Sequence, residues 1–228
     1  DIKYTVYSPD SGIAQTKVLG ELPEKTFWLD LNKPSPEELR QLGHRFKIHP
    51  LTIEDIQVLD DREKCEMFED YLFICVRTVD QTPTLVDGLG RPLPIPVNVY
   101  IILFKDFILT VHSGPLPHIP HVLRRIDQDR RFGGLTPDWI MYTILDDVVD
   151  EFMPSIRIME LESDSIEDLV MVLSQSDRHE MLRRIGAARK RVVHLMRLLK
   201  PKIDVMKSLT KRNEDRLQAH TRTYLRDI

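Results

Sequence analysis

Apolar residues fall in short runs in the first half of the chain and recur at a helical period in the second half. The short runs are rich in Val, Ile, Leu and aromatic residues, which is typical of strands in a buried sheet. We predict strands at Lys3–Tyr7, Thr26–Leu31, Tyr71–Val79, Val97–Phe104 and Phe107–His112. Only Lys105 and Asp106 separate the last two strands, so we expect a tight hairpin there.

Two helix starts lie among these strands. Ser35 can cap a helix that begins at Pro36, because serine is a good N-cap and proline suits the first helical position. His49 and Pro50 open a second helix in the same way. The segment 81–96 contains prolines at four positions and glycines at two, and this composition predicts a loop.

The second half of the chain predicts two long helices. Thr136 and Pro137 mark the start of the first, Pro154 should kink it rather than end it, and the polar residues 174–177 should end it. Apolar spacings of three and four form a seam along each helix. The first seam consists of Leu145, Val149, Phe152, Ile156, Met159, Ser163, Ile166, Val170 and Leu173. The second consists of Leu182, Ile185, Val192, Met196, Leu199, Ile203, Met206 and Leu209, with Pro201 expected to interrupt it.

Charge divides these two helices sharply. Residues 137–170 hold one basic and 10 acidic residues, whereas residues 171–228 hold 15 basic and 6 acidic residues. Because the net charges of −9 and +9 cancel, we expect an antiparallel hairpin that is stabilised mainly by its apolar seam. We expect one structural unit made of a sheet part at 1–135, the hairpin packed on it at 136–211 and the start of a further helix at 212–228.

Length and composition narrow the class of protein. The chain has 228 residues, of which 42% are hydrophobic, so it can bury a real core. Its apolar runs are far shorter than the roughly 20 residues that cross a bilayer. The two cysteines make no disulfide framework and favour a reducing compartment. The chain begins with Asp1 and shows no signal peptide, so we expect a piece of a longer protein.

The sequence gives no enzyme signature. It has no nucleophile elbow, and Gly88 and Gly90 do not form a dinucleotide fingerprint. His118 and His121 have no cysteine nearby to complete a zinc site. The basic C-terminal block has an acidic partner in the same chain and few aromatic residues. We therefore expect neither an enzyme with catalytic residues nor a nucleic-acid partner.

Acidic residues carry the remaining candidate chemistry. Asp146 and Asp150 lie four residues apart on the first long helix, where like charges repel. Either a solvated or arginine-paired face or a bound cation can relieve that repulsion. Glu54 and Asp55 are neighbours, and a helix turns their side chains about 100° apart, so they cannot easily chelate one ion together. Oxygen ligands without His or Cys favour Mg²⁺ or Ca²⁺ over zinc.

Four stretches of the chain carry a family resemblance: FWLDL at 27–31, IHPLTIEDI at 48–56, KCEMFEDYLFI at 64–74 and PDWIMYTILDDVVDEF at 137–152. In this order they resemble the cytosolic domain of CorA-type magnesium transporters. Residues 183–209 are most similar to the fungal branch, which comprises plasma-membrane and vacuolar magnesium transporters. The resemblance implies an α/β fold in which a mixed β-sheet is sandwiched between helices (α/β/α), with a long antiparallel helix hairpin and the start of a stalk helix.

The resemblance also implies regulatory divalent-cation sites. One site would join Asp55 to Asp227 of a neighbouring subunit, and a second would join Glu54 to Asp146. Weak, regulatory Mg²⁺ is then the expected cofactor, and divalent cations are the only expected small-molecule substrates. Carboxylates of adjacent subunits would repel at low Mg²⁺ and open the pore, and bound Mg²⁺ would hold it shut.

The same resemblance implies a homopentameric channel at the plasma or vacuolar membrane, with this chain on the cytosolic face. Its two membrane helices and its Gly-Met-Asn pore motif are not in this chain, so the chain alone is expected to be a monomer or a non-native oligomer. Two alternatives stay open: a CorA-like carrier for zinc or another divalent cation, and a soluble adaptor whose hairpin binds partner helices. A Mg²⁺-dependent hydrolase has no base or nucleophile to support it.

Overall fold

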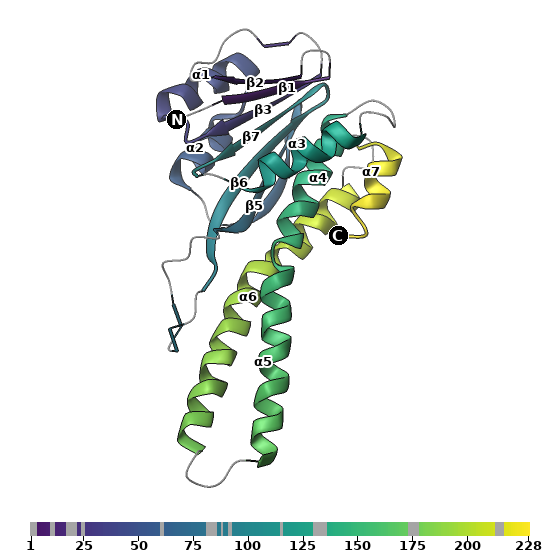
Figure 1. The fold of residues 1–228 in the computed structure, drawn as a ribbon. Helices are drawn as coiled ribbons and strands as arrows, with labels where there is room; N and C mark the ends of the chain where they lie inside the picture. The colour runs from purple at the N-terminus through teal and green to yellow at the C-terminus, as the bar shows by residue number, and fades with distance from the viewer. Residues whose placement is uncertain are drawn as a thin grey trace.

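Helices cover both faces of a mixed β-sheet, and two long helices project from it (Figure 1). The computed structural model describes residues 4–9, 12–16, 22–23, 26–59, 62–80, 86–87, 89–90, 93–114, 116–129, 136–172, 178–212 and 217–228. This arrangement confirms the predicted fold class, a mixed sheet sandwiched between helices with a long hairpin.

The sheet within the described residues has seven strands in the order β2-β1-β3-β7-β6-β5-β4. Strands β3 and β7 pair in parallel, and all other neighbours are antiparallel. The strands are β1 (Tyr4–Ser8), β2 (Gly12–Thr16), β3 (Phe27–Asn32), β4 (Lys64–Met67), β5 (Tyr71–Asp80), β6 (Ile95–Phe104) and β7 (Phe107–His112). All five predicted strands are confirmed, whereas the two short edge strands, β2 and β4, were not predicted.

Strand β6 begins two residues earlier than predicted, inside the segment expected to be a loop. Pro96 pairs with Val79 of β5, but β7 pairs with β6 only from Val99 onward. Pro96 therefore lies where β6 has one neighbouring strand, which is where a sheet tolerates proline.

One face of the sheet is covered by α1 (Pro36–Phe46) and α2 (Pro50–Val58), as Figure 1 shows. Both begin as predicted. The Ser35 hydroxyl accepts a hydrogen bond from the backbone N–H of Glu38, and the Glu38 carboxylate accepts one from the backbone N–H of Ser35. The core on this face includes Leu29, Phe73, Tyr100 and Leu109 from the strands with Leu39, Leu42, Ile53 and Ile56 from the helices.

The other face is covered by α3 (His118–Asp129), α4 (Pro137–Asp150) and residues from the C-terminal part of the chain, between 205 and 228. Thr136 occupies the N-cap position of α4 as predicted, but its side chain makes no capping hydrogen bond. Helix α3 was not predicted. The core here includes Trp28, Ile74, Ile101 and Ile108 from the strands, Ile126, Ile144, Leu145 and Val205 from the helices, and Leu217 just before the last described helix.

The hairpin consists of α5 (Met153–Val172) and α6 (Arg178–Arg212), which lie side by side and run in opposite directions (Figure 1). This confirms the predicted antiparallel pair of acidic and basic helices. The prediction that Pro154 only kinks one long helix is wrong, because α4 ends at Asp150, residues 151–152 form a turn and α5 begins at Met153. The Glu151 backbone in this turn is still right-handed. The predicted break at 174–177 and Leu173 lie outside the described residues.

The register of the seam on α6 differs from the prediction. Helix α6 runs through Pro201, and its buried positions are Met181, Ala187, Arg191, Leu195, Leu198, Lys202, Val205 and Leu209. Of the predicted seam residues, Leu182, Ile185, Val192, Met196 and Ile203 are exposed. The true buried stripe contains two cations, so its hydrophobicity is lower than that of the exposed stripe beside it.

The last described helix, α7 (Ala219–Tyr224), packs against α4 (Figure 1). Across the described residues, no helix is both long and apolar enough to cross a membrane.

Candidate metal sites

Helix α2 fixes the positions of Glu54 and Asp55. Its start is attached to β5, because the Tyr71 hydroxyl lies 3.0 Å from the His49 backbone N–H and 2.8 Å from the Thr52 hydroxyl. With the apolar side of α2 buried on the sheet, the Glu54 side chain is exposed and the Asp55 side chain is partly buried at the edge of the helix. The two carboxylates therefore point in different directions, as helix geometry requires.

Asp55 already has a cationic partner within the chain. The Lys64 ammonium donates a hydrogen bond to the Asp55 carboxylate at 2.7 Å, and about one fifth of each side chain is exposed, 21% and 23% respectively. Lys64 comes from the edge strand β4 and also lies 3.6 Å from a carboxylate oxygen of Glu66. Lys64 was not predicted as a partner, because no local spacing connects it to Asp55.

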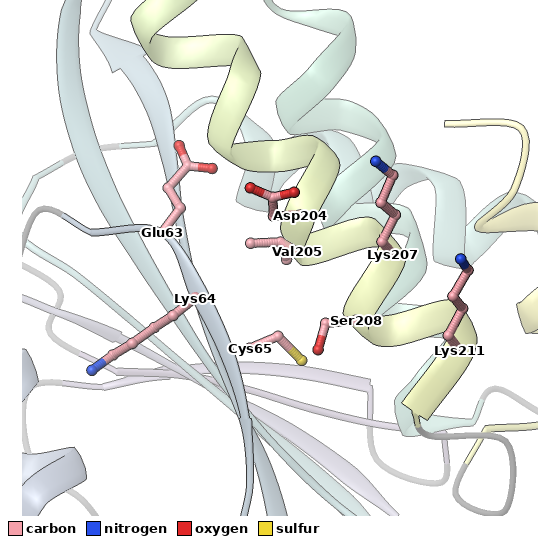
Figure 2. A pocket seen from close by; sticks show the side chains of 8 residues that line it. All are labelled: Glu63, Lys64, Cys65, Asp204, Val205, Lys207, Ser208 and Lys211. Atoms are coloured by element: carbon pink, nitrogen blue, oxygen red, sulfur yellow. The ribbon is translucent and has the colours of Figure 1, made fainter.

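The opposite side of β4 faces a cleft of about 390 Å³ between this strand and α6. Figure 2 shows Cys65, Asp204 and Ser208 around this cleft and Lys64 directed away from it. Glu63, which lines this cleft, accepts a hydrogen bond from the Lys202 ammonium of α6 at 2.5 Å. Burial raises the pKa of Glu63 and lowers the pKa of Lys202, so their mutual hydrogen bond keeps together two charges that burial disfavours. None of the four predicted metal ligands lines this cleft.

Asp146 lies on α4 and is also paired. The Arg125 guanidinium of α3 donates to its carboxylate at 2.6 Å and lies 5.7 Å from the centre of the Tyr142 ring. Burial alone would lower the pKa of Arg125, but the hydrogen bond and charge of Asp146 raise it. An arginine-paired face was one of the two explanations that the sequence left open for this acidic stretch, and the structure shows it at Asp146.

Asp227 follows α7 and is exposed. The Tyr224 ring stacks on Tyr142 at 5.5 Å, and this contact sets the start of the segment that carries Asp227. The pKa of Tyr142 is raised by burial first, then by the charge of Asp146 and also by that of Asp227. Asp146 and Asp227 therefore lie on the same side of the molecule, around one tyrosine.

Asp147 forms a further polar cluster with α3, which was not predicted. Its carboxylate lies 2.5 Å from His118 Nδ1 and 3.3 Å from His121 Nδ1, and the other ring nitrogen of His118 lies 2.6 Å from the Thr78 hydroxyl. Burial would raise the pKa of Asp147, but the two histidines lower it below its ordinary value. The only sequence signal was the His-x-x-His spacing, which places both rings on one side of a helix.

The four predicted ligands do not converge within one chain. Glu54 and Asp55 lie with α2 on one face of the sheet, whereas Asp146 and Asp227 lie with α4 and α7 on the other (Figure 1). No group of three or more His, Cys, Asp or Glu side chains in the described ranges is placed to hold a metal ion. The donors do suit Mg²⁺ in kind, because it prefers carboxylate oxygens and keeps several water ligands. A site that uses one residue from each face requires two copies of the chain.

The chain matches the model of the CorA-like Mg²⁺ transporter protein family over residues 23–228. It is 41% identical over 192 residues to the magnesium transporter ALR1 of Saccharomyces cerevisiae, a match that covers 84% of this chain and 22% of that protein. A putative metal ion transporter of Schizosaccharomyces pombe is 44% identical over 191 residues, covering 83% of this chain and 23% of the relative. The solved soluble domain of CorA from Methanocaldococcus jannaschii has the same fold, with a TM-score of 0.71, 19% identity and coverage of 99% of this chain and 86% of that one.

These similarities first define the class of the chain, which is a CorA-type α/β domain of the kind found in metal ion transporters. More specifically, the chain belongs to the CorA-like Mg²⁺ transporter family, and these two yeast relatives bear out the predicted similarity to fungal members. The chain spans about a fifth of the length of those relatives, 22% and 23%.

Proposed function

We propose that this chain is the Mg²⁺-sensing regulatory domain of a CorA-like divalent cation transporter, on the cytosolic face of the plasma or vacuolar membrane. The transporter would be a homopentamer, and adjacent copies of this domain would share divalent cations. The yeast relatives are named as magnesium and metal ion transporters, which favours magnesium as the transported cation.

The separation of the candidate ligands supports this proposal most directly. One face of the domain carries Glu54 and Asp55, and the opposite face carries Asp146 and Asp227. In a ring, one face of each copy meets the opposite face of the next copy. A single interface could then bring Asp55 to Asp227 and Glu54 to Asp146 of the adjoining copy.

Weak sites are sufficient for such a sensor. A cation present near its Kd stabilises the bound form by only about 0.4 kcal/mol per site. Five equivalent interfaces would contribute roughly 2 kcal/mol, enough to shift a two-state gate more than tenfold. The carboxylates would repel one another when Mg²⁺ is scarce, and bound cations would hold the ring in its closed form.

The test uses the full-length transporter with Asp55→Ala and Asp227→Ala, separately and together. We expect transport to continue at Mg²⁺ levels that shut off the wild type, because the bridging cation has lost its ligands. Asp106→Ala, in the exposed turn between β6 and β7, is a control that removes an acid away from the candidate residues. Shut-off at the wild-type Mg²⁺ level in the double variant would show that these residues do not sense the cation.

The proposal also predicts how the isolated domain associates. Residues 1–228 should form weak pentamers or none in Mg²⁺-free buffer, because the interfaces then bring carboxylates together without a cation. Static light scattering measures this directly. A stable pentamer without Mg²⁺ would contradict the prediction.

A further inference from the structure

Two of the four candidate ligands are each held by a cation from a neighbouring element. Lys64 of β4 binds Asp55 at 2.7 Å, and Arg125 of α3 binds Asp146 at 2.6 Å. The pairs lie on opposite faces of the sheet, so the same arrangement occurs at both proposed sites. For Glu54 and Asp227, which are exposed, the described residues show no ion pair.

Lys64 is fixed in place more firmly than an ordinary surface lysine. The antiparallel register of β4 and β5 sets its backbone opposite Cys75. Its ammonium lies 5.8 Å from the centre of the Phe73 ring, and only 21% of its side chain is exposed. Figure 2 shows that the Lys64 side chain is directed away from α6 and lies on the opposite side of β4 from Cys65. The strand therefore delivers a positive charge to the Asp55 carboxylate.

We propose that Lys64 is a tethered cation: its ammonium stays paired with the Asp55 carboxylate until a divalent ion displaces it. Arg125 has the same relation to the Asp146 carboxylate. This inference rests on the proposed function, because it assigns a regulator to the cation site at Asp55. An ammonium and a dication at the same carboxylate repel each other, so binding of the ion requires Lys64 to move away. The consequence is a lower affinity, which matches a sensor of abundant Mg²⁺. Without a divalent ion, Lys64 offsets only part of the Asp55 charge, because the pair is partly exposed, and it keeps α2 attached to β4.

The test removes the charge of Lys64 in the full-length transporter, where adjoining copies are present, and measures the binding of the metal itself. Lys64→Met keeps an aliphatic side chain against Phe73, and Lys64→Arg keeps the charge. Mn²⁺ is a suitable probe, because it prefers oxygen ligands as Mg²⁺ does. Binding is measured by loss of the free Mn²⁺ electron paramagnetic resonance signal, and Mg²⁺ competition and thermal unfolding are followed on the same samples. Lys105→Met makes the same change in net charge at an exposed turn and is the matched control.

We expect Lys64→Met to bind Mn²⁺ roughly tenfold more tightly than the wild type, the effect typical of removing a like charge at this distance. Lys64→Arg and Lys105→Met should bind like the wild type. Adding Asp55→Asn to Lys64→Met should abolish the gain. Equal affinity of Lys64→Met and Lys105→Met, no detectable Mn²⁺ binding by Lys64→Met, or a gain that survives Asp55→Asn would each overturn the inference.

The same titrations separate this inference from the proposed function. If Asp55→Asn weakens Mn²⁺ binding while Lys64→Met leaves it unchanged, the cation site stands and the tethered cation is wrong. If Asp55→Asn has no effect on binding in either background, the proposed cation site itself fails, and the inference about Lys64 fails with it.

Discussion

The sheet and the hairpin bury very different side chains. Phe73, Ile74 and Ile101 at the centre of the sheet are fully buried among other apolar residues. The buried stripe of α6 instead includes Arg191 and Lys202, while apolar residues of α6 stay exposed beside it. The sheet is thus stabilised by removing apolar surface from water, whereas the hairpin combines a smaller apolar cluster with buried charge pairs.

Polar side chains in and beside the buried stripe of α6 join the helix to other parts of the chain. Arg191 pairs with Glu162 of α5 and with Asp87 beyond β5. His194 lies 2.7 Å from the Pro94 carbonyl before β6, and Lys202 pairs with Glu63 before β4. We expect these contacts to favour one register of α6 on the domain, because a uniform apolar stripe defines register less strictly.

The largest expected effect is on the sheet side of this comparison. Phe73→Ala removes a fully buried ring between two layers of the fold and should lower the free energy of unfolding by about 4 kcal/mol. Urea denaturation monitored by circular dichroism gives the value. Met67→Ala, at an exposed position on the neighbouring strand β4, is the control and should change little. A loss below about 1 kcal/mol for Phe73→Ala would mean that this core is not tightly packed.

An intermediate effect should come from the charge pair that attaches α6 to the sheet. Lys202→Met leaves the Glu63 carboxylate buried without its cation and should cost about 3 kcal/mol in unfolding free energy. Adding Glu63→Gln removes the uncompensated charge, so the double variant should recover most of the loss. The same urea titration measures all three proteins. If the double variant is no more stable than Lys202→Met alone, the pair is not what makes this position sensitive.

The smallest effect should be found on the exposed apolar stripe of α6. Met196→Ala removes a side chain that is 58% exposed and should change the free energy of unfolding of this domain by less than about 0.5 kcal/mol. Leu198→Ala, two residues away and buried, is the paired comparison and should cost about 2–3 kcal/mol. Equal losses of unfolding free energy for the two variants would show that the stripe containing Met196 is covered by protein in solution.

Much of the fold could be predicted because its core elements have strong local signals. The five central strands are apolar runs, and α1 and α2 begin with a good cap followed by proline. Edge strands β2 and β4 are short and half polar, so their composition does not separate them from loops. Helix α3 follows a segment with several prolines, and this hid the apolar spacing of Ile119, Val122 and Ile126.

The candidate site was less predictable, because its determining contacts join residues far apart in the chain. Sequence spacing singled out Asp146, but its partner Arg125 is 21 residues away on another helix. The α6 seam was placed wrongly for a related reason, since hydrophobicity alone cannot identify a buried arginine or lysine whose partner is on another element. Whether the predicted carboxylates bind cations stays a prediction.

Helix α6 has the geometry of a lever. Pro201 lacks a backbone N–H and so weakens the helix at one point, and Lys202, directly after it, holds the helix to the sheet. The Arg178 end lies about 35 Å from that point along the helix axis. A tilt of about 10° at Pro201 would therefore carry that end of the arm through about 6 Å. A small tilt of α6 beside the sheet would thus be amplified at its Arg178 end.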